Sequence, residues 1–129
     1  MDKVLFAVYG TLRRGHGNYQ YLLEGNSTFL GEHITEPKFT MYTTGGFPIV
    51  ATEGETPIHI EVFEVTDPET IHGVNQLEGF SGVKNSPDNW YDTITVDTPY
   101  GPAEMFYQSP EKISSRSMRV IESGNWNDR

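Results

Sequence analysis

The stretch Val4-Leu5-Phe6-Ala7-Val8-Tyr9-Gly10-Thr11-Leu12-Arg13-Arg14-Gly15-His16-Gly17-Asn18 decides the fold. It opens with an apolar run of strand length, and apolar residues on both sides of the pleat are typical of a strand buried on both faces. The run breaks at Gly10, and a loop with further glycines and two arginines follows. Glycine permits positive φ and lets a ligand come close to the backbone. The stretch therefore predicts either a simple turn after a central strand or a small-anion or oxyanion site built from backbone N–H groups.

The length and composition predict a soluble protein with one domain over residues 1–129. No apolar run approaches the roughly 20 residues that span a bilayer. The start at Met1-Asp2-Lys3 shows no signal-peptide pattern. The absence of cysteine excludes disulfides and a cysteine nucleophile, and it fits the cytoplasmic location that we expect.

The net charge of −9 argues against a nucleic-acid partner, which would need a basic surface to meet phosphates. Arg13 and Arg14 are too few for a duplex groove, although two arginines suffice for one small anion. The alternative is a solvated loop, and it suits Arg14 in particular.

We expect neither a metal nor a cofactor. No serine lies in a nucleophile-elbow pattern, and the glycines lack both the Walker lysine and the dinucleotide fingerprint. Metal-ligand spacing is missing from the four histidines, which are His16, His33, His59 and His72.

Strand-like segments dominate the chain. Their periodicity and composition predict strands over Ser27–Thr35, Phe39–Tyr42, Phe47–Ala51, Ile58–Val65, Trp90–Val96 and Ala103–Tyr107. A hairpin turn is expected at Thr98–Gly101, a short helix or a turn at Tyr19–Glu24, and a tail helix within Ser109–Ser123. The fold class that follows is α+β: a small mixed β-barrel with one main helix and minor helical additions.

The main helix has clear end signals. Thr66-Asp67-Pro68-Glu69 offers an N-cap, a proline at the first helical position and an early acidic residue. The helix should run to about Leu77 and stop at Gly79, with one apolar stripe formed by Ile71, Val74 and Leu77. Glu78 then falls at the C-terminal end, where the macrodipole disfavours negative charge. That mismatch indicates either a functional position or an ordinary exposed glutamate.

Two motifs resemble those of a known family. Tyr9-Gly10-Thr11-Leu12-Arg13, with Gly15 and Asn18 after it, resembles the signature of the gamma-glutamylcyclotransferase-like family. Val74-Asn75-Gln76-Leu77-Glu78-Gly79-Phe80 resembles its other hallmark, a helix end with the catalytic glutamate before a glycine. The resemblance covers nearly the whole chain, from Tyr9 to about Tyr107.

The resemblance implies a cofactor-free cyclotransferase, of the carbon–nitrogen lyase or acyltransferase type. Its substrate would be a γ-glutamyl amine or a γ-glutamyl peptide, and its products 5-oxoproline and a free amine or amino acid. Glu78 would act as general base and then acid. Backbone N–H groups of Gly10, Thr11 and Leu12 would bind the oxyanion.

Further residues are implied as substrate contacts. Tyr9 and Tyr91 match family tyrosines, and each either contacts the substrate or Glu78 or is an ordinary core tyrosine. Arg13 could pair with the substrate α-carboxylate, unless the backbone turn binds that group alone. Asn18 could fasten the loop.

The sequence departs from the family pattern at several positions. Ile60 replaces a glycine, Asn75 an aspartate and Thr93 an arginine, and the Ser81–Asn89 loop is longer than usual. We expect this loop and the strand that contains Ile60 to help form the pocket rim, so the departures bear on substrate identity.

Two other functions compete with the enzyme. One is a non-catalytic module that binds a γ-glutamyl compound or a carboxylate on the same fold; such a binder has no use for a carboxylate at Glu78. The other is an interaction protein, which would show a large exposed apolar patch. For the enzyme we expect a small-molecule substrate, no nucleic acid, no membrane, and a monomer or a weak homodimer.

Overall fold

The computed structural model describes residues 3–10, 12–43, 48–83, 86, 89–108 and 118–128. None of the helices in these ranges is long and apolar enough to cross a bilayer. The elements in chain order are β1 (Val4–Val8), the π-helical turn η1 (Tyr19–Leu23), β2 (Thr28–Ile34), β3 (Phe39–Thr43), β4 (Pro48–Thr56), β5 (His59–Val65), α1 (Pro68–Leu77), β6 (Asp92–Val96), β7 (Ala103–Tyr107), β8 (Arg119–Val120) and the 3₁₀ turn η2 (Trp126–Asp128).

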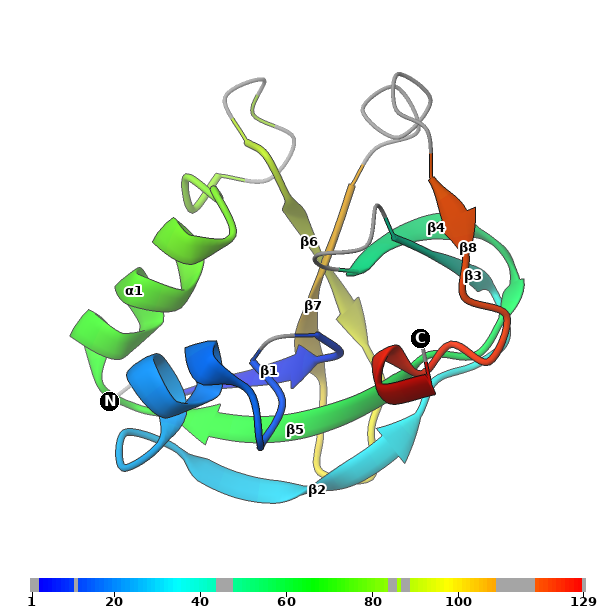
Figure 1. Ribbon diagram of the computed structural model, residues 1–129. Helices are drawn as coiled ribbons and strands as arrows, with labels where there is room; N and C mark the ends of the chain where they lie inside the picture. The colour runs from blue at the N-terminus through cyan, green and yellow to red at the C-terminus, as the bar shows by residue number, and fades with distance from the viewer. Residues whose placement is uncertain are drawn as a thin grey trace.

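The strands form two sheets (Figure 1). One has five strands in the order β2-β5-β1-β7-β6, and the other has three in the order β4-β3-β8. Strand β1 is central, antiparallel to β5 and parallel to β7, so the first sheet is mixed. Helix α1 and η1 lie together on one side of the β1–β5 ladder (Figure 1).

The expected α+β class is confirmed, but the expected barrel is not. A barrel needs an unbroken ladder around its circumference. In the described chain the ladder of the first sheet ends at β2 and at β6, and the second sheet is separate. A backbone hydrogen bond from Gln108 N to Val50 O (3.0 Å) links the two sheets without closing them.

Strand β1 is buried on both faces, as its apolar run predicts. Ala7 packs into one hydrophobic cluster, and Phe6 and Val8 pack into the other. The chain continues from this strand to Tyr9, which is also buried. The end of β1 is therefore a fixed point from which the glycine loop begins.

The predicted tail helix is wrong in the part that the structure describes. Residues 109–117 lie outside the described residues. Arg119–Val120 form strand β8, which pairs with β3. The next residue, Ile121, donates its N–H to Met41 O (2.8 Å) and is buried. Pairing with the edge of β3 satisfies the backbone hydrogen-bonding groups of this segment, so no helix is needed.

Helix α1 begins and ends where the sequence predicts. Asp67 is the N-cap and accepts a hydrogen bond from Glu69 N (3.3 Å), and Pro68 takes the first helical position. Of the expected apolar stripe, Val74 is fully buried, whereas Leu77 is 43% exposed. The N-terminal part of the stripe therefore faces the core, and its last member reaches the surface.

The C-terminus of α1 is closed by a left-handed residue. Gly79 has φ +65°, and its N–H donates to Gln76 O (3.1 Å) while Phe80 N–H donates to Asn75 O (2.8 Å). This pair of bonds is a Schellman motif, in which glycine is preferred. A Cβ at Gly79 would also lie 2.6 Å from Trp90 Cβ. Backbone conformation and close packing both require glycine here.

We expect Gly79→Ala to lower the free energy of unfolding by about 3 kcal/mol, combining left-handed strain of roughly 1–2 kcal/mol with an overpacking penalty of roughly 1–3 kcal/mol. Urea denaturation followed by circular dichroism measures the change. Gly82→Ala is the matched control, because Gly82 has φ +94° but open space around it. Equal losses in the two variants would contradict the close packing of Gly79 on Trp90.

Candidate functional site

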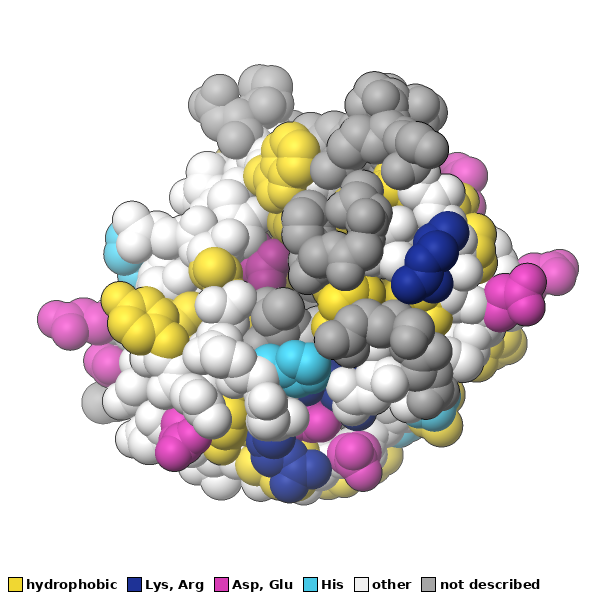
Figure 2. All heavy atoms as spheres, viewed as in Figure 1, with side chains coloured by type: hydrophobic (Ala, Val, Ile, Leu, Met, Phe, Trp, Pro, Cys, Tyr) yellow, Lys and Arg dark blue, Asp and Glu magenta, His cyan; other side chains and the backbone are white. Residues whose placement is uncertain are grey.

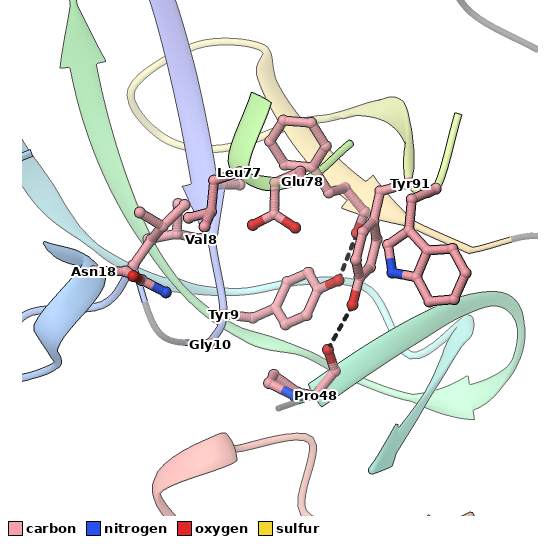
Figure 3. Close-up of a pocket in the computed structure, with 12 residues that line it drawn as sticks. Val8, Tyr9, Gly10, Asn18, Pro48, Leu77, Glu78 and Tyr91 are labelled. Atoms are coloured by element: carbon pink, nitrogen blue, oxygen red, sulfur yellow. Dashed lines mark hydrogen bonds between the residues drawn. The ribbon is translucent and has the colours of Figure 1, made fainter. Parts of the chain in front are cut away.

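A pocket of about 340 Å³ lies between β1, the C-terminal end of α1 and β7 (Figure 3). This volume suits a small molecule. The residues that line it are Ala7, Val8, Tyr9, Gly10, Leu12, Asn18, Pro48, Leu77, Glu78, Trp90, Tyr91 and Phe106.

Glu78 points its carboxylate into this pocket (Figure 3). It caps α1 with helical φ and ψ, and its N–H donates to Val74 O (3.2 Å). Burial raises the pKa of the carboxyl group from 4.5 to about 7. Part of the residue's surface remains exposed to solvent. A carboxyl with a pKa near neutrality can both accept and donate a proton.

Tyr9 and Tyr91 lie beside Glu78 (Figure 3). The Tyr9 hydroxyl donates to Phe106 O (2.7 Å), and the Tyr91 hydroxyl donates to Pro48 O (3.1 Å). Burial, and then the neighbouring Tyr91 and Glu78, raise the pKa of Tyr9 well above its ordinary value. The core interpretation is confirmed, because both tyrosines are buried in the hydrophobic clusters. Each also forms part of the pocket wall, and its contact with a substrate stays a prediction.

The glycine loop forms another wall. Gly10 and Leu12 line the pocket, and Arg13 N–H closes the turn on Gly10 O (3.0 Å). A Cβ at Gly10 would lie 2.6 Å from Pro48 Cγ, so this glycine is needed for packing against the protein itself. Thr11, the remaining residue of the predicted oxyanion turn, lies outside the described residues.

Arg13 is not brought to the other predicted site residues. Its side chain is buried, with Nε donating to Glu61 Oε2 (3.1 Å) and Nη1 donating to Asn125 Oδ1 (2.8 Å). It is absent from the described pocket lining. The guanidinium therefore fastens the loop to β5 and to the C-terminal segment.

Arg14 shares the same carboxylate. Its backbone N–H donates to Glu61 Oε1 (2.9 Å), its Nε donates to the same oxygen (3.2 Å), and its guanidinium lies 3.6 Å from the centroid of the Phe29 ring. The side chain is 44% exposed, so the solvated-loop interpretation of Arg14 describes its outer part. Both arginines of the motif thus balance the buried Glu61.

The three substituted positions of the family pattern lie outside the described pocket lining. Ile60 is in the hydrophobic core, Thr93 is buried in β6, and Asn75 accepts the hydrogen bond of the Schellman motif through its carbonyl. No residue of β5 and no described residue of the Ser81–Asn89 loop lines the pocket either, so the expectation that this loop and strand help form the rim is not met in the described part of the chain.

Sequence reasoning missed the apolar part of the wall. Leu77, Trp90 and Phe106 line the pocket, but their apolar character predicts only strand or helix packing. The available signal was position, since Leu77 and Trp90 are the direct neighbours of Glu78 and Tyr91. Across the described part of the chain, no group of three or more histidine, aspartate and glutamate side chains is arranged to hold a metal ion.

Comparisons with known proteins agree with the motifs. The model of the family described as "Gamma-glutamyl cyclotransferase, AIG2-like" matches residues 6–128. The "Putative gamma-glutamylcyclotransferase" of Vibrio cholerae serotype O1 is 34% identical over 130 residues, covering 100% of this chain and 99% of that protein. The "Gamma-glutamylcyclotransferase family protein YtfP" of Escherichia coli K12 is 32% identical over 123 residues, or 95% of each chain.

A solved structure is also similar. The crystal structure of protein PH0828 from Pyrococcus horikoshii shares 28% sequence identity and a TM-score of 0.70, over 97% of this chain and 91% of that chain. Sequence motifs, family model and fold agree. The chain belongs to the gamma-glutamyl cyclotransferase, AIG2-like family.

Proposed function

We propose that the protein is a cofactor-free cyclotransferase that converts a γ-glutamyl amine or γ-glutamyl peptide into 5-oxoproline and a free amine or amino acid. The observation that carries the proposal is the Glu78 carboxyl, which lies with a pKa of about 7 in a pocket whose lining also includes Gly10 and Leu12 of the glycine turn. Family membership supports the reaction class.

The reaction needs no water and no external group. The substrate α-amine attacks its own γ-carbonyl carbon, the new C–N bond closes a five-membered ring, and the original amide C–N bond breaks. Glu78 takes a proton from the attacking amine and gives it to the leaving nitrogen, so the carboxylate is restored after each turnover. Holding the amine and the carbonyl together exploits the effective molarity of oriented intramolecular reactions, on the order of 10⁵–10⁸ M.

The pKa of Glu78 suits both proton transfers. A carboxyl near its ordinary pKa of 4.5 would be a weak base toward an ammonium group. Burial raises the pKa to about 7, which brings the proton affinity of the carboxylate closer to that of the amine. The same carboxyl, once protonated, remains acidic enough to supply the leaving nitrogen.

The turn at Gly10 is our candidate for the remaining task, which is to bind the oxyanion. Gly10 and Leu12 present backbone at the pocket, and the backbone N–H groups of this turn, Thr11 included, are our candidates for binding the tetrahedral oxyanion. Tyr9 and Tyr91 donate their hydroxyl protons to backbone carbonyls, which fixes both rings as walls against the γ-glutamyl group.

We expect Glu78→Gln to lower kcat for 5-oxoproline release by roughly 10²–10⁴-fold, because the amide cannot act as a base. The assay uses a panel of γ-glutamyl amines and γ-glutamyl dipeptides, with binding measured by calorimetry. Glu69→Gln, on the first turn of α1, is the matched control and should keep full activity. Binding without turnover by the wild-type protein would instead indicate the non-catalytic module.

The buried carboxyl also predicts how stability depends on pH. Between pH 4.5 and about 7 the unfolded chain releases this proton while the folded protein keeps it. The contribution of Glu78 to stability therefore falls as pH rises through that window, by on the order of 2 kcal/mol once partial exposure is allowed for. Glu78→Gln removes the effect, so thermal denaturation should show the variant gaining on the wild type from pH 4.5 to pH 8. A constant difference across that range would contradict the raised pKa.

A further inference from the structure

Trp90 exposes apolar surface at the pocket. It lines the cavity, yet it is 47% exposed, and Leu77, also part of the lining, is 43% exposed. Figure 2 shows hydrophobic side chains at the surface of this face, around a recess in which an acidic side chain is visible. Apolar surface beside a binding cavity is a common mark of contact with a ligand.

The position of Trp90 is fixed by the turn that carries Glu78. Its N–H donates to Gly79 O (2.8 Å), and its Cβ fills the space that a Gly79 side chain would occupy. The following residue, Tyr91, donates its N–H to Glu78 O (3.2 Å). The backbone of Trp90 is thus fixed against the turn that carries Glu78, while about half of the residue remains open to solvent.

The proposed reaction indicates which part of the substrate faces the exposed surface of Leu77 and Trp90. The leaving nitrogen must come within hydrogen-bond distance of the Glu78 carboxyl in order to receive its proton. The γ-glutamyl half is expected on the side of the Gly10 turn, so the substituent on the leaving nitrogen extends toward the exposed part of the lining. Leu77 and Trp90 provide that part.

The charge of the lining also limits which substituents on the leaving nitrogen are favourable. Among the described lining residues, Glu78 is the single charged side chain, and Arg13 is held away on Glu61. A carboxylate on the leaving amine would therefore approach Glu78 without a cation from this part of the lining. Like charges held close together in a partly buried site repel each other.

We propose that Trp90 is a specificity-determining residue that contacts the leaving group, and that the preferred substrates are γ-glutamyl amides of apolar or aromatic amines that carry no carboxylate. This inference rests on the cyclotransferase reaction proposed above. It adds the chemical class of the leaving amine and the residue that selects it.

The test compares γ-glutamyl-phenethylamide with two matched amides. γ-Glutamyl-ethylamide lacks the ring, and γ-glutamyl-phenylalanine keeps the ring but adds a carboxylate. We expect the wild-type kcat/KM for the phenethylamide to exceed that for the ethylamide by about tenfold, a typical effect of one aromatic contact. It should also exceed that for γ-glutamyl-phenylalanine, because the added carboxylate is repelled by Glu78. Trp90→Ala should remove the advantage over the ethylamide, while Trp90→Phe keeps most of the advantage.

Controls separate contact from folding. Tyr21→Ala removes another exposed aromatic residue, 82% exposed and outside the described lining, and should change no ratio. The chain has two tryptophans, and Trp126 is buried in the core. In a Glu78→Gln background, binding of the phenethylamide should therefore shift tryptophan emission to the blue, and the additional Trp90→Phe substitution should abolish the shift.

The outcomes distinguish the two proposals. Equal kcat/KM for the phenethylamide and the ethylamide, or a ratio unchanged by Trp90→Ala, overturns the role of Trp90 while 5-oxoproline release upholds the reaction. Faster turnover of γ-glutamyl-phenylalanine than of the phenethylamide overturns the assignment of the leaving amine. Absence of 5-oxoproline from every amide overturns the reaction itself, and the inference falls with it.

Discussion

The pocket depends on the left-handed turn at Gly79. This residue ends α1 through the Schellman bonds and leaves room for the Cβ of Trp90. The same turn joins the returning chain through two backbone bonds, from Trp90 N to Gly79 O and from Tyr91 N to Glu78 O. The proposed base, one wall tyrosine and the exposed indole are thus fixed relative to one another by backbone geometry.

The buried charges outside the pocket hold the loop after β1 in position, and the described pocket lining has one charged side chain. Glu61 is buried in β5 and receives Arg13 and Arg14, which fastens the loop after β1 to the sheet. Such a buried pair gives little net stability, because desolvation offsets attraction, but removing one partner is costly. With both arginines committed there, Glu78 remains the sole charged side chain of the described lining. Burial is what raises the pKa of its carboxyl group.

Signals from neighbouring residues in the sequence correctly predicted the individual strand β1 and helix α1. The apolar run of β1 and the cap signals of α1 depend on neighbouring residues, and both elements appear where expected. The motifs also led to Glu78, Tyr9 and Tyr91, which the fold brings to one cavity. Long-range features were not accessible in the same way. Sheet closure depends on which edges meet, β8 depends on the free edge of β3, and the direction of Arg13 depends on a glutamate 48 residues away.

The pKa of the Glu78 carboxyl in the folded protein is the most direct test of its role as the base. Carbon-13 NMR of protein labelled at the glutamate side-chain carboxyl, recorded from pH 3 to pH 9, gives this value, and the Glu78→Gln spectrum identifies the resonance. A titration midpoint at about 7 is predicted, because burial destabilises the carboxylate. A midpoint near the ordinary value of 4.5 would show a solvated carboxyl, and it would contradict the assignment of Glu78 as a base poised for proton transfer.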